Sequence, residues 1–282
     1  MNRMMITSTN TLSQLQLKLD TISNNIANVD TTGYKRKEAN FTDLLVQQFN
    51  NQTTASQEIG RLTPNGIRQG TGAKLGQSQL ILTQGSLKTT NRSLDAAFTK
   101  PDLFFSVRVS DESGENIRYT RDGAFFMTPV DGNDQQVMLV TGDGNSVLDE
   151  FNRPIVVNGN VTDISMSENG QIKIETSDRG TQTFELGIVS VKKPQFMEQL
   201  GGNVLALPSN FNQLNMNAED ILTSLTGGLR GEISMTQGAL EGSNVDLSKE
   251  MSNLIMVQRQ YQFQSRAITM ADQMQGIVNS IR

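Results

Sequence analysis

Two long stripes of apolar residues, one at each end of the chain, most constrain what this sequence can fold into. From Leu12 onward, the N-terminal stripe advances in alternating steps of three and four residues, which is the heptad spacing of one helix face. The C-terminal stripe has the same spacing from Met256 onward. The sequence therefore predicts one helix from about Met4 to Asn28 and another from about Asp246 to Ile281, roughly 37 and 50 Å long at 1.5 Å per residue.

Both stripes need a partner surface. The first consists of Met5, Leu12, Leu15, Leu19, Ile22 and Ile26, and the second of Met256, Gln260, Phe263, Ala267, Met270, Met274, Ile277 and Ile281. Since neither helix has apolar sequence beside it to bury this face, we expect the two helices to pair with each other and with the same helices in other copies. An antiparallel hairpin closing within one chain fits the pattern equally well.

The middle of the chain favours β structure. Its β-branched and aromatic runs predict strands at 102–110, 117–127, 137–141, 146–148, 154–157 and 183–191. The Gly-Asp-Gly-Asn sequence at 142–145 predicts a hairpin turn.

The register of one hairpin follows from its apolar residues. A three-residue loop over 168–170 pairs Met166 with Ile172 and Ile164 with Ile174, whereas a two-residue loop would mix the two faces. We therefore expect the longer loop, with its glycine in the left-handed conformation.

These elements predict an α+β fold in three parts. The terminal helices, residues 1–30 and 246–282, form a helical hairpin or coiled-coil region. Residues 31–83 and 201–245 form extended, irregular connectors, and residues 84–200 form a central, mostly antiparallel β domain.

The composition argues against several functional classes. The chain contains no Cys and no His, which excludes thiolate metal sites and Ser-His-Asp catalysis and argues against an enzyme. The net charge of −5 gives no basic patch for nucleic acid. No apolar run has the length of a signal-peptide core or a membrane span, so we expect neither a cleaved signal nor membrane insertion. Stretches 70–76, 131–134 and 143–145 lack phosphate-loop or calcium-loop spacing, so we expect no cofactor and no metal.

Two motifs at the helix junctions carry a family resemblance. Residues 24–35 read Asn-Asn-Ile-Ala-Asn-Val-Asp-Thr-Thr-Gly-Tyr-Lys, and residues 238–247 read Gly-Ala-Leu-Glu-Gly-Ser-Asn-Val-Asp-Leu, leading into Gln258–Tyr261. They resemble the N- and C-terminal signatures of flagellar rod and hook proteins. Residues 84–87, 94–97, 119–123 and 147–148 resemble the β domain of the distal rod and hook. Residues 99–102 depart from the family, which has a Gly-rich turn there, and leave the shape of this turn open.

The chain length indicates which members of the family this sequence resembles most. Proximal rod subunits are much shorter and hook proteins are longer, so 282 residues with one β region resemble a distal-rod subunit. A hook-basal-body paralogue from a Gram-positive flagellum fits equally well.

The resemblance implies a non-enzymatic structural subunit of the flagellar basal body, outside the cytoplasmic membrane. It implies polymerisation with itself, contact with other rod and hook proteins, and passage through the flagellar export apparatus. The helices would line the inner tube, and their folding would be coupled to polymerisation. Two alternatives are a non-polymerising adaptor or capping protein and a cell-wall glycan hydrolase. A hydrolase needs paired carboxylates, and nothing groups the candidates Glu112, Glu115, Asp122 and Asp149.

We expect the assembly interface to combine the stripes with the junction motifs. Its expected residues are Met5, Leu12, Leu15, Leu19, Ile22, Asn24, Asn25, Ile26, Asn28, Thr31, Gly33, Tyr34, Asn244, Val245, Asp246, Met256, Tyr261, Phe263, Met270, Met274 and Ile277. The Asn side chains would bond neighbouring backbones, with plain helix termination as the alternative. Tyr34 and Lys35 would anchor the bend after the helix, with a solvent-exposed Lys35 as the alternative.

Overall fold

The chain divides into two compact units. The first contains Met1–Asn24, Glu38–Ser78 and Ser248–Arg282, and the second contains Asn25–Lys37 and Gln79–Leu247. The computed structural model describes residues 3–43, 46–49, 67–70, 73–111, 114–130, 133–177, 180–201, 203–208 and 217–280.

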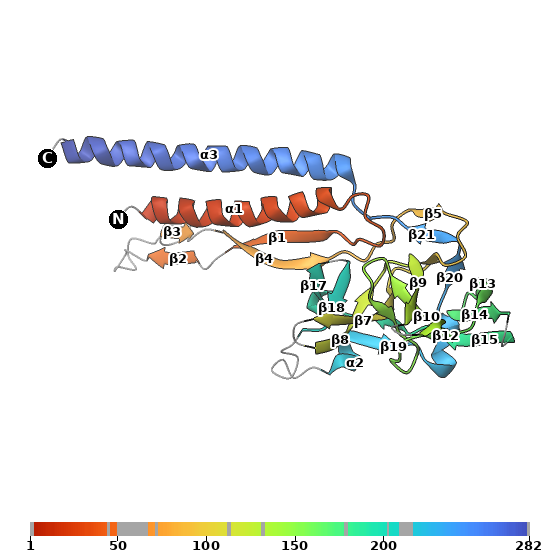
Figure 1. Ribbon diagram of the computed structural model, residues 1–282. Helices are drawn as coiled ribbons and strands as arrows, with labels where there is room; N and C mark the ends of the chain where they lie inside the picture. Colours follow the sequence, from red (N-terminus) through yellow and green to blue (C-terminus); the bar gives the residue numbers. More distant parts are fainter. Residues whose placement is uncertain are drawn as a thin grey trace. The chain divides into compact units, whose positions relative to one another are not determined.

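Both terminal helices form where the stripes predict them. Helix α1 spans Arg3–Ala27 and helix α3 spans Leu247–Ser280, each within about a residue of the predicted bounds (Figure 1). The first unit also contains four strands. They are β1 (Lys37–Asp43), β2 (Val46–Phe49), β3 (Ile67–Gly70) and β4 (Ala73–Leu80).

The strands of the first unit fall in the segment expected to be a connector. β1 pairs with β4, and β2 pairs with β3 in antiparallel fashion. Figure 1 shows β1 and β4 running alongside α1. Contacts that join them include two from the middle of the helix: the Leu75 N–H donates to Oε1 of Gln14 over 2.8 Å, and Nζ of Lys18 lies 4.8 Å from the ring centroid of Phe41. These strands therefore cover one face of α1.

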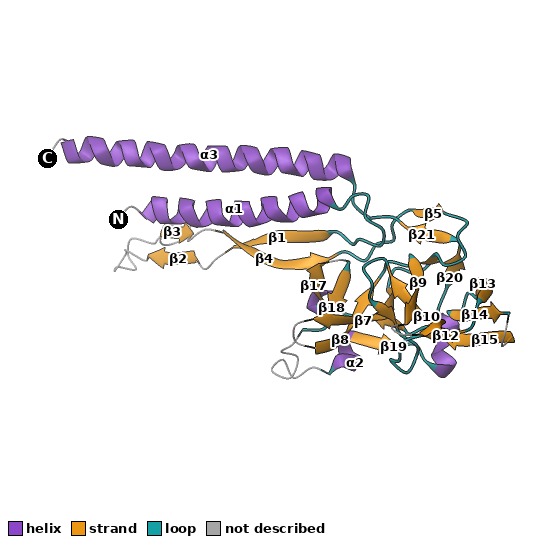
Figure 2. Ribbon diagram, in the orientation of Figure 1, coloured by secondary structure: helices purple, strands orange, loops and turns teal. Residues whose placement is uncertain are grey.

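The second unit is built mainly of antiparallel strands (Figure 2). Its main sheet has the order β12-β10-β11-β7-β8-β18-β17, with β9 paired to β10 and with β16 joining β7 to β19. The bounds are β7 Leu103–Asp111, β8 Gly114–Thr120, β9 Phe125–Val130, β10 Asn133–Thr141, β11 Ser146–Val147, β12 Val156–Asn158, β16 Ile188–Val191, β17 Glu198–Gly201, β18 Val204–Ala206 and β19 Leu222–Ser224. Short helices η2 (Pro194–Phe196), α2 (Ala218–Ile221) and η3 (Gly227–Glu232) connect its later strands.

A separate three-stranded sheet confirms the predicted hairpin. It contains β13 (Val161–Met166), β14 (Gln171–Thr176) and β15 (Gly180–Glu185) in that order. Ile164 pairs with Ile174 and Met166 pairs with Ile172. Gly170 has a φ of +78°, as the three-residue loop requires. The apolar face therefore determined the register, because a slip of one residue would have turned these side chains to the other face.

Two small strand pairs join distant parts of the chain. β5 (Leu87–Thr89) pairs with β21 (Ala239–Glu241), and β6 (Ala96–Phe98) pairs with β20 (Met235–Gln237), both antiparallel. The segment that leads into α3 is thereby held against the start of the β region.

The core of the second unit is centred on aromatic rings. The ring centroids of Phe98 and Phe105 lie 4.2 Å apart, and those of Phe105 and Phe125 lie 5.0 Å apart with the rings nearly perpendicular. Such edge-to-face contacts add to the stabilisation that comes from burial alone. A second buried cluster contains Phe104 and Tyr119 on the neighbouring strands.

The structure corrects two predicted strands. Residues 117–127 form β8 and β9, because the chain turns between them: the Asp122 N–H donates to Oγ1 of Thr120, and Oδ1 of Asp122 accepts the Ala124 N–H. Residues 183–191 likewise form β15 and β16. Between these two strands, the Gly187 N–H donates to the Leu148 carbonyl of another segment. Side-chain hydrogen bonds and a change of pairing partner end these strands. Neither can be predicted from the pattern of hydrophobic residues.

Candidate functional site

The stripe of α1 is covered within the chain. Leu15 and Ile22 are buried, and Met5, Leu12, Leu19 and Ile26 are partly buried. The single chain therefore covers much of this stripe.

The described part of the α3 stripe is different, because its large side chains are exposed; Ile281, the last member of the stripe, lies outside the described residues. Met256, Phe263, Met270, Met274 and Ile277 are each 53 to 70% accessible to solvent. Exposed apolar patches of this kind mark interaction surfaces. We call these five residues the exposed seam. Its pairing in a coiled coil stays a prediction.

A second row on α3 faces inward. Val257 and Ala271 are 2% and 0% exposed, and Glu250 is also buried. These three positions are separated by seven and fourteen residues, so they occupy one face of the helix. The covered row therefore lies next to the exposed seam on the helix.

A cavity of about 620 Å³ opens between the two helices of the first unit. Phe263 of the exposed seam lines it, as does Leu15 of α1. The complete lining is Thr11, Leu15, Phe41, Ala73, Arg259, Gln260, Phe263 and Gln264. The single chain thus leaves space beside one member of the seam.

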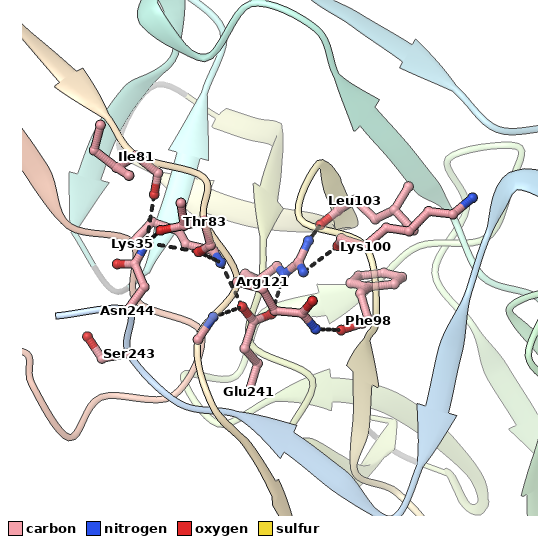
Figure 3. A network of polar contacts seen from close by, with 12 residues as sticks. Lys35, Ile81, Thr83, Phe98, Lys100, Leu103, Arg121, Glu241, Ser243 and Asn244 are labelled. Carbon is pink, nitrogen blue, oxygen red and sulfur yellow. Dashed lines mark hydrogen bonds and ion pairs between the residues drawn. The ribbon is translucent and has the colours of Figure 1, made fainter. Parts of the chain in front are cut away.

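In the second unit, a buried charged cluster joins three distant parts of the chain (Figure 3). Nζ of Lys35 lies 2.6 Å from Oε1 of Glu241, and Nε of Arg121 lies 2.5 Å from Oε2 of the same carboxylate. The Gly85 N–H also donates to Oε1 of Glu241 over 2.8 Å. All three charged side chains are at most 4% exposed as residues. One carboxylate therefore binds two cations and a backbone amide out of solvent.

The remaining donors of the two cations are directed at backbone oxygens. Lys35 donates to the Thr83 carbonyl, and Arg121 donates to the carbonyls of Leu103 and Lys100. Buried charges are tolerated when they are paired and hydrogen-bonded, and this cluster meets both conditions. The turn over 99–102, which departs from the family, contributes to this cluster. The backbone carbonyl of Lys100, within this turn, accepts a hydrogen bond from Arg121.

The pKa directions in the cluster follow from burial and neighbouring charge. Burial lowers the pKa of Lys35, and the Arg121 guanidinium lowers it further against the opposing effect of Glu241. Burial also lowers the pKa of Arg121. For Glu241, burial acts to raise the pKa, but Arg121, Lys35 and the Gly85 amide together hold it below its ordinary value. The carboxylate is therefore stabilised in its charged form.

Side-chain amides organise the chain on either side of the cluster. Oδ1 of Asn25 accepts the Tyr34 O–H and the Lys37 N–H, so the end of α1 is tied to the segment that follows it. The Asn244 side chain accepts the Arg36 N–H and donates to the carbonyls of Ile81 and Thr83. We call residues 33–36, 81–86 and 241–244, together with Arg121, the clasp.

The clasp contains three of the expected interface residues: Gly33, Tyr34 and Asn244. Their described contacts, and those of Asn25, lie within the chain, and their contact with a second copy stays a prediction. The structure places the remaining expected residues elsewhere: Asn24, Asp246 and Tyr261 are exposed, and Asn28, Thr31 and Val245 are partly buried.

Sequence reasoning missed the partners of the cluster. Lys35 is buried and ion-paired, so the alternative of a solvent-exposed side chain is wrong. Arg121 and Glu241 lie within the quoted motifs, but nothing in their spacing indicated that they meet. The one available signal was a lone charge, Glu241, between the apolar Leu240 and the small Gly242.

The described residues contain no group of three acidic side chains positioned to bind a metal ion. Within the same residues, no helix combines the length and hydropathy that crossing a membrane requires. The charged groups of the clasp are paired with one another and hydrogen-bonded to backbone groups, so the arrangement is suited to holding segments together.

Relatives of the whole chain are flagellar proteins. The flagellar hook-basal body complex protein FlhP of Bacillus subtilis is 42% identical over all of both chains. The flagellar basal-body rod protein FlgG of Borreliella burgdorferi is 34% identical over 100% of this chain and 99% of its own. FlgG of Bacillus subtilis is 30% identical over 95% of each.

The chain belongs to the flagellar basal-body rod protein family.

Three family models match separate parts of this rod-family chain. Residues 5–35 match the flagella basal body rod protein model, and residues 102–174 match the D1 domain of the flagellar hook protein FlgE/F/G. Residues 236–281 match the C-terminal model of the flagellar basal body rod FlgEFG proteins. The terminal matches include both sides of the clasp and most of the two helices. The chain is thus a structural rod subunit, and its likeness to FlgG fits the distal-rod type.

Proposed function

We propose that this rod subunit polymerises with copies of itself into the distal part of the flagellar axle. The observation that carries the proposal is the exposed seam of α3, whose large apolar side chains are each more than half exposed. A seam repeating every seven residues accepts the matching face of another helix. Because such a contact between copies need not close on itself, it generates a helical filament.

The proposal includes the surroundings of the filament. The helices form its inner part as a coiled-coil region, other rod and hook proteins bind its ends, and the chain acts without catalysis, cofactor, nucleic acid or membrane insertion. The subunit reaches the basal body through the flagellar export apparatus without a cleaved signal. The membership of the family and its relatives support this setting.

Paired substitutions on neighbouring faces of α3 test polymerisation. Phe263→Ser with Met270→Ser removes two members of the exposed seam. Gln262→Ser with Thr269→Ser changes the positions one residue earlier, which are also exposed. Burying a Phe or Met side chain contributes about 1.5–3 kcal/mol, so the seam variant should raise the critical concentration for polymers at least about a hundredfold. The control variant should assemble like the unmodified chain, by sedimentation and electron microscopy.

The same measurements distinguish the alternative of an adaptor or capping protein. An adaptor stays unpolymerised at every concentration yet binds the ends of existing rods. Mass spectrometry of purified hook–basal bodies provides the second check, because a polymerising subunit is present in many copies. Monomers at all concentrations, together with one or two copies per basal body, would overturn polymerisation.

A further inference from the structure

The two segments that lead to the terminal helices contact each other directly in the clasp. On the N-terminal side, the Gly33 N–H donates to the Glu241 carbonyl over 2.8 Å, and the Tyr34 carbonyl accepts the Asn244 N–H over 3.4 Å. The Arg36 N–H donates to Oδ1 of Asn244 over 2.8 Å. With the ion pair of Lys35 and Glu241, four contacts join residues that lie more than 200 positions apart.

A third segment lies between them and shares its contacts with both sides. The Ile81 N–H donates to the Arg36 carbonyl, and the Thr83 carbonyl accepts from Lys35. On the other side, the Gly242 N–H donates to the Ser86 carbonyl. The intervening segment is therefore complete in its hydrogen bonding only when both terminal segments are in place.

The buried charges strengthen the dependence of each terminal segment on the other. Glu241 is supplied by the C-terminal side, Lys35 by the N-terminal side and Arg121 by the β region. If the C-terminal side leaves, two buried cations lose the carboxylate that bonds them both. If the N-terminal side leaves, the Glu241 carboxylate loses one cation and the Glu241 backbone carbonyl loses the Gly33 N–H. A buried charge without its partner is strongly unfavourable, so neither side is stable in its place alone.

We propose that the clasp couples the two ends of the chain: the segments after α1 and before α3 dock onto the β region as one event, and release of either releases the other. The coupling belongs to the single chain and goes beyond polymerisation. By thermodynamic linkage, the effect of the N-terminal side on the C-terminal side equals the reverse effect.

Hydrogen exchange of the full chain tests the coupling, with each substitution measured on the opposite side. Lys35→Met removes the N-terminal charge, and its effect is measured at the Gly242 amide, whose acceptor is Ser86. Glu241→Gln removes the C-terminal charge, and its effect is measured at the Lys37 amide, whose acceptor is Asn25. Neither of these two amides bonds the substituted side chain.

Two references separate coupling from a general loss of stability. The Ser167 amide, bonded to the Gln171 carbonyl in the β13–β14 hairpin, reports on the β region. Arg108→Met and Glu115→Gln break a single ion pair of 3.2 Å on the β7–β8 hairpin, where Glu115 is 65% exposed. This solvated pair should leave the exchange of Gly242 and Lys37 unchanged.

The expected result is reciprocal. Both clasp substitutions should accelerate exchange on the opposite side about 10- to 100-fold, within the usual range for coupled sites. Ser167 should keep its protection. The double variant should accelerate exchange by less than the product of the two single effects.

Two results would overturn the coupling. In one, each substitution accelerates exchange only in its own segment. In the other, the double variant accelerates exchange at Gly242 and Lys37 by the full product of the two single effects, as independent sites would. If Glu241→Gln also exposes Ser167, Asn244→Ala is measured at Lys37 by the same criteria, because Asn244 bridges the segments without a charge. The result is independent of polymerisation, since unassembled chains are used throughout.

Discussion

At the scale of single residues, the clasp depends on how closely two backbones approach. A Cβ atom on Gly85 would lie 2.0 Å from the carbonyl oxygen of Gly242, which is backbone and cannot swing aside. The amide of Gly85 must also stay within reach of Glu241. The position therefore requires glycine for space.

Gly85→Ala should lower the free energy of unfolding of the second unit by about 2–3 kcal/mol, because the backbones must separate. The control is Gly228→Ala, since a Cβ atom there meets no atom within 4 Å. Urea unfolding followed by circular dichroism compares the two. Equal midpoints for both variants would contradict the close approach.

The pKa of the Asp122 carboxyl is shifted upward, opposite to the lowered pKa of Glu241. Burial raises its pKa above the ordinary 3.8, against the Ala124 amide, which lowers it. A raised pKa in the folded state favours folding at low pH, and this contribution is lost as the pH rises through the folded value. At neutral pH the partly buried carboxylate is therefore unfavourable.

Asp122→Asn should raise the free energy of unfolding at pH 7, because the amide oxygen still accepts the Ala124 N–H without burying a charge. The gain should disappear below the ordinary pKa of Asp, where the unmodified side chain is also neutral. Denaturation at a series of pH values measures it. A variant that is less stable than the unmodified chain at pH 7 would contradict this account.

At the scale of elements, the three-stranded sheet β13-β14-β15 separates two costs of a side chain at a left-handed glycine. Gly170 has a φ of +78° and Gly180 one of +73°. A Cβ atom on Gly170 would lie 2.5 Å from Cδ1 of Ile188, whereas one on Gly180 meets nothing within 4 Å. The two positions thus share backbone strain and differ in packing.

Gly180→Ala should cost about 1–2 kcal/mol from the left-handed conformation alone. Gly170→Ala should cost more, because Ile188 must also move within the core. Thermal unfolding of both variants gives the comparison. A smaller loss for Gly170→Ala would show that the loop over 168–170 relaxes away from Ile188.

How far the sequence predicted these elements depends on the range of the interactions that form them. Both helices and the hairpin register follow from local periodicity, since the apolar face alone decides them. The break after Thr120 does not, because it arises from polar side chains bonding their neighbours. The cover over α1 was also missed, because residues 38–78 carry little apolar sequence although their strands contact the helix.

The clasp lies beyond any local pattern. Lys35 and Glu241 are separated by 206 residues, and spacing cannot bring them together. For the candidate interface, the sequence predicted the apolar stripe of α3, and the structure shows five of its large side chains, the exposed seam, accessible to solvent. Which copy or protein covers it is a property of the assembly, so one chain does not determine it.

At the scale of the whole molecule, assembly should change the exchange of α3 more than that of the β region. Residues 272–280 are all exposed in the single chain. Their amides should exchange rapidly in dilute samples and slow by at least about tenfold in polymers, while the β13–β14 hairpin stays protected in both. Mass-spectrometric hydrogen exchange of sedimented and soluble fractions measures this. Unchanged exchange of α3 in polymers would place the contacts elsewhere.

The exposed seam also has a consequence for how the cell supplies this protein. Copies that meet away from a growing rod would bury their seams in each other and form clumps from which no axle can grow. The pool of finished but unused chains must therefore be kept small, or each seam must be shielded until delivery. The pace of synthesis is thereby tied to the rate at which the rod end consumes subunits.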